Sequence, residues 1–82
     1  MPWVELIWEW DEEDGNVAHI AEHGVSPDDV EHVFENPVRH EKSRSSGRSM
    51  VFGYTSDGRR IAVVYEQLDE TTLYPVTAYE VE

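Results

Sequence analysis

An almost unbroken apolar run at residues 61–65 (IAVVY) places the strongest limit on how this chain can fold. A continuous run, in contrast to an alternating one, predicts a central strand that is covered on both faces. The turn signal SDG just before it predicts a short hairpin to a strand at 48–55. Strand composition recurs at 38–43 and at 71–79, where Pro75 favours an edge or a bulge. The C-terminal half is therefore predicted to form a four-stranded meander.

The beginning of the chain has two further patterns, one of a strand and one of a helix. Apolar residues alternate with glutamates near the N-terminus, which predicts a first strand at about 4–9. Asp11 is a suitable cap for a helix that begins in DEEDGN, although Gly15 weakens its first turn. We expect Asn16 to cap or brace this helix, and Gly24 to end it as a C-cap.

A second helix is predicted from strong signals at both of its ends. Ser26 is an expected N-cap, Pro27 suits the first helical position, and Asn36 closes the helix. Its apolar face consists of Val30, Val33 and Phe34. The full order reads β-α-α-β-β-β-β. The chain is thus predicted to be one α+β domain spanning 1–82, with two N-terminal helices packed on one face of an antiparallel sheet.

Several functional classes are excluded by what the sequence lacks. No cysteine occurs among the 82 residues, so neither a disulfide scaffold nor a thiolate zinc site is available. No apolar run approaches the roughly 20 residues that span a bilayer, and the N-terminus lacks the basic start of a signal peptide. A glycine-rich phosphate loop is missing as well. We expect a soluble cytoplasmic protein with no membrane partner and no nucleotide cofactor.

Charge is distributed unevenly along the chain, whose formal net charge is −12. Residues 1–38 contain 11 acids and no Lys or Arg, whereas all six basic residues lie between Arg39 and Arg60. The strong net charge favours a basic partner protein. The basic segment has two interpretations: it neutralises acidic neighbours across the fold, or it forms a local phosphate-binding surface.

The letters HIAEH spell a short zinc-hydrolase motif, with His19 and His23 four residues apart and Glu22 between them. On a helix both imidazoles share a face, but they lie to the side of the apolar stripe. A catalytic zinc needs three protein ligands and an enclosing cleft, and the enzymes with this motif have a much larger fold. We therefore expect surface histidines and no metal site.

A longer pattern around these histidines resembles the BrnT family of bacterial toxins. The matching elements occur in the family's order: Trp10-Asp11, Asn16, His23-Gly24-Val25-Ser26, Val33-Phe34 and Pro37. A weaker likeness continues through 47–66 (GRSMVFGYTSDGRRIAVVYE). The resemblance implies a RelE-like fold, in which two helices pack against a curved antiparallel sheet. It also implies a type II toxin that cleaves RNA and is neutralised by a ribbon-helix-helix antitoxin.

Metal-free RNA cleavage would assign roles to residues of the basic segment. The ribose 2′-hydroxyl attacks the adjacent phosphate, helped by a general base, a general acid and positive charge. We expect Arg48 and Arg60 to hold phosphate, His40 to act as base or acid near neutral pH, and Tyr54 or Tyr65 to stack a base or donate a proton. The other basic residues, Arg39, Lys42, Arg44 and Arg59, are expected RNA contacts. Arg48 and one of Arg59 or Arg60 match family positions; His40 matches none.

A rival hypothesis keeps the scaffold without the catalysis. Where the family has an arginine in its last strand, this chain has Tyr79, and the net charge is unusual for an RNA-cleaving toxin. The protein would then be a noncatalytic interaction module whose acidic surface serves a basic partner, with Trp3 as one possible contact. A metal-dependent hydrolase is a third hypothesis, which would require zinc bound at His19 and His23.

Overall fold

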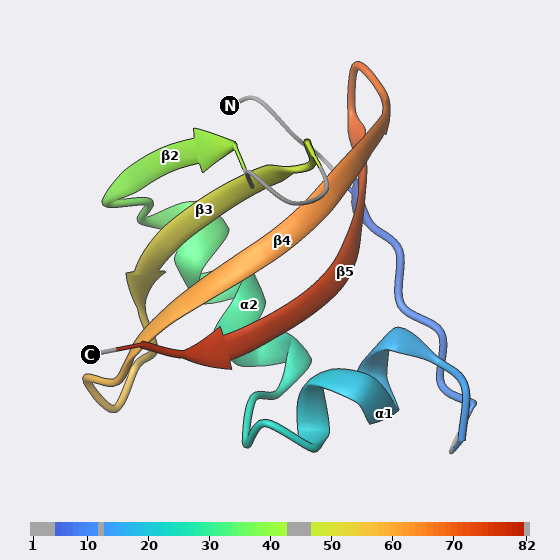
Figure 1. The fold of residues 1–82 in the computed structure, drawn as a ribbon, viewed down its shortest axis with the longest axis horizontal. Helices are drawn as coiled ribbons and strands as arrows, with labels where there is room; N and C mark the ends of the chain where they lie inside the picture. Colours follow the sequence, from blue (N-terminus) through green and yellow to red (C-terminus); the bar gives the residue numbers. More distant parts are fainter. Residues whose placement is uncertain (1–4, 12, 43–46, 82) are drawn as a thin grey trace.

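The computed structural model describes residues 5–11, 13–42 and 47–81, and it has the α+β architecture and the element order predicted above (Figure 1). The elements are β1 (Glu5–Leu6), α1 (Asn16–Ala21), α2 (Pro27–Glu35), β2 (Arg39–Lys42), β3 (Ser49–Tyr54), β4 (Arg60–Asp69) and β5 (Thr72–Glu80). No helix in these described ranges is long and apolar enough to cross a membrane.

The five strands form one mixed sheet in the order β1-β5-β4-β3-β2. Strands β2 to β5 are the predicted antiparallel meander, with β4 at its centre. An edge or a bulge was predicted at Pro75: β5 is not an edge strand, and the register shifts between Val64 and Tyr65, where Tyr65 pairs with Pro75, as a bulge would produce. The prediction of a wholly antiparallel sheet was wrong, because β1 pairs with β5 in parallel. Turn signals identify hairpin neighbours, but they do not identify the partner of a strand that two helices separate from the rest.

The first strand is shorter than the predicted 4–9. Beyond its end, hydrogen bonds of the Asn16 side chain take the place of backbone bonds between strands. The amide of Asn16 donates to the carbonyl oxygens of Ile7 and Pro75, both at 2.9 Å, and its oxygen accepts from the backbone N–H of Glu9 at 2.8 Å. Asn16 is only 4% exposed. It therefore braces the N-terminal segment against β5, a wider role than the expected brace of the helix alone.

The helix ends agree with the sequence at α2 and differ at α1. Ser26 and Asp29 cap α2 reciprocally, each side chain bonded to the other residue's backbone N–H. Helix α1 begins only at Asn16, the last residue of DEEDGN, and its N-cap is Gly15 and not the predicted Asp11. Asp11 instead accepts bonds from the backbone N–H groups of the next turn, at 2.8 and 3.0 Å. Its carboxylate closes a turn of its own and caps no helix.

Both helices contribute to one core on one face of the sheet. Figure 1 shows α2 crossing behind β3 and β4, with α1 beside β5. The core cluster contains Ile20, Val25, Val30, Val33 and Phe34 from the helical layer and Val51, Ile61, Val63, Leu73 and Ala78 from the sheet. Alternate residues of β4 point away from this core, and yet Ala62 and Val64 are 0% and 9% exposed. The central strand is thus buried on both sides, although helices cover only one.

Candidate nucleic-acid interface

The face of the sheet without helices collects cations and aromatic rings from three strands. Odd-numbered residues of β3 and β4 belong to the helix-side core, so even-numbered ones point to the opposite side. Pairing extends this assignment to β2, where Arg39 and Glu41 oppose Phe52 and Met50. We call this surface the helix-free face; its members include Arg39, Glu41, Met50, Phe52, Tyr54, Arg60, Ala62, Val64 and Glu66.

Phe52 is the centre of the helix-free face. The guanidinium carbons of Arg39 and Arg60 lie 4.8 Å and 5.9 Å from the centroid of its ring. Such cation–π contacts each contribute about 0.5–1 kcal/mol at exposed sites and orient the planar guanidinium groups. Phe52 is only 9% exposed, so the two guanidinium groups are the more accessible part of this arrangement. Tyr54, which is 48% exposed, pairs with Arg60 across the strands and adds an accessible aromatic ring.

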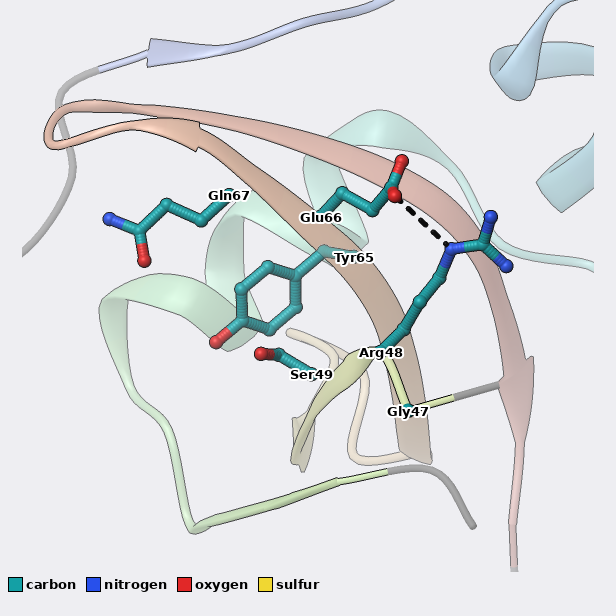
Figure 2. Close-up of a pocket in the computed structure, with 6 residues that line it drawn as sticks. All are labelled: Gly47, Arg48, Ser49, Tyr65, Glu66 and Gln67. Carbon is teal, nitrogen blue, oxygen red and sulfur yellow. Dashed lines mark ion pairs between the residues drawn. The ribbon is translucent and has the colours of Figure 1, made fainter. Parts of the chain in front are cut away.

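The opposite end of the sheet has a hollow beside Arg48. Its volume is about 290 Å³, and it is lined by Gly47, Arg48, Ser49, Tyr65, Glu66 and Gln67. Nε of Arg48 lies 3.6 Å from Oε2 of Glu66, and Figure 2 shows these two side chains turned toward each other. The ring of Tyr65 points away from them toward Ser49 (Figure 2), and it packs edge-to-face on Phe34 at 5.0 Å between centroids.

The predicted catalytic residues do not meet at one point. Arg60 begins β4, whereas Arg48 pairs with Glu66 six residues further along that strand. At about 3.3 Å per residue, the two arginines are separated by about 20 Å. His40 and Lys42 pair with Val51 and Ser49, whose side chains point to the helix side of the sheet, so they lie on the opposite face from Arg39. Both are exposed there. The structure therefore divides the candidates between two ends and two faces of the sheet. Arg44 lies outside the described residues.

Arg59, an expected RNA contact, is engaged in bonds within the protein. Its guanidinium donates to the carbonyl oxygen of Gly24 at 2.8 Å and to Oδ2 of Asp29 at 3.1 Å. It also forms an ion pair with Asp57 at 3.3 Å, and this contact raises the pKa of Arg59. These bonds join the β3–β4 hairpin to the loop between the helices and to the first turn of α2. Arg59 consequently contributes to the fold, and its charge is largely offset by carboxylates.

Replacing Asp57 by Asn is expected to destabilise the protein near neutral pH and to lose this effect in acid. Hydrogen bonds from Thr55 and Arg59 hold the pKa of the Asp57 carboxyl below its ordinary value. Such a group stabilises the fold above its unfolded-state pKa of about 3.9, and the contribution is lost as the pH falls through the lower folded-state pKa. Urea unfolding of both proteins from about pH 7 to about pH 2 measures the difference. A difference that grows on acidification would contradict the assignment.

His19 of α1 and His23, just after the end of that helix, lie together on the surface, as expected. The rings of His19 and His23 are 5.5 Å apart between centroids, and both residues are exposed. Tyr79 is the next ring, 6.3 Å from His23. Within 5–11, 13–42 and 47–81, no group of three or more His, Cys, Asp or Glu residues is placed to hold a metal ion.

Sequence reasoning missed two residues of the interface, Phe52 and Glu66. The alternation in the segment SMVFGY already assigns Phe52 to the same face as Met50 and Tyr54. Glu66 follows the apolar run directly and, like Ala62 and Val64, is an even-numbered residue of β4, so all three point to the same face. Alternate residues of a strand point to opposite faces of the sheet, so even and odd positions along the predicted strands could have identified both residues.

Charge follows the layers of the fold. The described residues before Arg39, which include both helices, carry acids but no Lys or Arg. The helix-free face and its margin carry Arg39, Arg48 and Arg60, with Glu41 and Glu66 beside them. The molecule thus has an acidic helical side and a sheet side that is richer in cations.

No family model, curated protein or solved structure matches the chain.

Proposed function

We propose that this protein is a BrnT-like toxin component that binds single-stranded RNA on its helix-free face. The observation that carries the proposal is the arrangement of Arg39 and Arg60 over Phe52, next to the accessible ring of Tyr54. Single-stranded RNA is recognised by stacking of its bases on aromatic rings and guanidinium planes and by cations along its backbone. The acidic helical side would repel the same RNA and so restrict binding to this face.

Cleavage is proposed at the hollow beside Arg48. Glu66 would take the proton of the ribose 2′-hydroxyl as its oxygen attacks phosphorus, and Arg48 would stabilise the charge on the phosphate oxygens. The 5′-oxygen of the next nucleotide would leave and take a proton from water, because the ring of Tyr65 points away from this ion pair. The ion pair between Arg48 and Glu66 supports this assignment, because it already holds base and cation side by side. No step requires a metal ion.

The decisive test measures binding and cleavage of a long mixed-sequence RNA in EDTA. Arg60→Ala is expected to weaken RNA affinity by about tenfold. The slope of log affinity against log salt concentration should become shallower by about one, as one fewer counterion is released. Lys42→Ala removes the same charge from the helix side of the sheet, and should stay within about twofold of the parent protein. Equal losses in both variants would reduce the proposal to nonspecific charge attraction.

Cleavage provides a separate outcome for Arg48 and Glu66. Arg48→Ala and Glu66→Gln are expected to abolish cleavage in EDTA while each retains most of the RNA affinity. A folded protein that neither binds nor cleaves RNA would contradict the toxin proposal. It would favour the second candidate, a noncatalytic interaction module on the same scaffold. That alternative has its own support in the exposure of Trp10, which is 71% accessible on the acidic side.

In this proposal the cognate partner is an antitoxin of the ribbon-helix-helix type or another basic protein. A basic partner complements the helical side, where the described residues before Arg39 carry no Lys or Arg.

A further inference from the structure

A second hollow lies on the helical side, between the N-terminal segment and α1. Its volume is about 360 Å³, and it is lined by Trp10, Asp11, Val17, Ala18 and Ala21. We call it the Trp10 groove. The segment that carries Trp10 is fixed in place, since the backbone N–H of Val17 donates to the carbonyl oxygen of Glu9 at 3.4 Å and Asn16 bonds Glu9 from the other side. The groove is therefore built into the fold.

The lining of the groove suits the side chains of another protein. Trp10 forms a large apolar wall that is 71% exposed, and tryptophan is prominent among residues that dominate binding energy at interfaces. The α1 side of the lining, which we call the floor, consists of Val17, Ala18 and Ala21, and the small side chains of the two alanines allow a partner backbone to approach closely. Among the described residues, Trp10 belongs neither to the core cluster nor to the partly buried side chains packed against it, in contrast to Trp8. Its exposure is explained by a partner more readily than by folding.

Charge around the groove selects the partner further. Asp11 lines it directly, and Glu22 follows Ala18 by four residues, which places its carboxylate on the same side of the helical turn. The nearest residues in sequence, Glu9, Glu13 and Asp14, are acidic too. Phosphate groups would be repelled here, whereas lysine and arginine would be attracted.

We propose that the Trp10 groove docks an amphipathic basic helix of a partner protein. The apolar side chains of that helix would contact Trp10 and the alanine floor, and its flanking lysines or arginines would face the acidic rim. A helix is favoured over an extended strand because the lining offers side chains of α1 and no free strand edge. The groove is remote from the helix-free face, so this inference does not rest on RNA binding.

The probe is a fluorescein-labelled synthetic peptide of about 18 residues, or five helical turns, with leucine on one face and lysine on the other. Fluorescence anisotropy with the full chain measures its affinity. Trp10→Ala is expected to weaken binding at least tenfold. Leu68→Ala is the matched control, because Leu68 is 57% exposed on β4 and lies outside the groove. It should leave the affinity unchanged.

A second peptide separates apolar docking from charge attraction. With serine in place of every leucine, the peptide keeps its charge and should lose at least tenfold in affinity. Ala18→Arg, which fills the floor and adds a positive charge, should abolish binding of the leucine peptide while the circular dichroism spectrum stays that of the parent protein. Equal affinity of Trp10→Ala and the parent protein, or of the two peptides, would overturn the inference, whatever the outcome with RNA.

Discussion

Replacing Asn16 by Ala is expected to lower the free energy of unfolding by about 3 kcal/mol, which shifts the unfolding equilibrium by about two orders of magnitude. The substitution deprives three backbone groups of their partner: the carbonyl oxygens of Ile7 and Pro75 and the N–H of Glu9. Each unsatisfied group away from water costs about 1–3 kcal/mol, and the bond to Pro75 is fully buried. Urea unfolding at neutral pH measures the effect.

Asn36→Ala is the matched control for this experiment. Asn36 is exposed at the end of α2, and its side chain makes a single long bond of 3.4 Å to the carbonyl oxygen of His32. Its loss should cost no more than about 0.5 kcal/mol. If Asn16→Ala and Asn36→Ala destabilise the protein equally, the bracing role of Asn16 is contradicted.

Elements with local signals were predicted well, and those that depend on distant contacts were not. The reciprocal cap of Ser26 and Asp29, the proline at position 27 and the turn signals of the meander all act within a few residues. The length of β1 and the start of α1 depend on the bond from Asn16 to Pro75, across 59 positions of sequence. Local pattern does not contain such a bond, so both boundaries were misplaced.

In the candidate site, too, the features that depend on local sequence could be predicted, and those that depend on distant contacts could not. The basic segment and the alternation of β3 and β4 were readable, and they are sufficient to assign Arg60 and Tyr54 to one face. The separation of Arg48 from Arg60 needs the register of two strands. The engagement of Arg59 needs the position of Asp29 on another element. Residue type alone therefore grouped as one site side chains that the sheet holds apart.

Gly15→Ala is expected to destabilise the protein by about 3 kcal/mol, at the upper end of the cost of overpacking. Gly15 has an ordinary φ of −75°, so the backbone conformation itself suits alanine. The surrounding space does not accommodate a methyl group. A Cβ at Gly15 would overlap the carbonyl oxygen of Glu9 and lie 2.9 Å from its carbonyl carbon and 3.0 Å from the nitrogen of Asp11. These are backbone atoms, and they move only if the segment that carries Trp10 moves too.

Gly58→Ala separates this steric effect from the usual conformational cost of replacing glycine. Gly58 has a φ of +92°, and apart from its chain neighbours no described residue has an atom within 4 Å of a Cβ placed there. Its substitution therefore strains only the backbone and should cost about 1 kcal/mol. Because Gly15 positions one wall of the Trp10 groove, Gly15→Ala should also weaken the leucine–lysine peptide under conditions where the protein stays folded. Gly58→Ala should not change peptide affinity. A Gly15→Ala protein as stable as Gly58→Ala would show that the N-terminal segment is free to shift, and the groove would then lose its fixed wall.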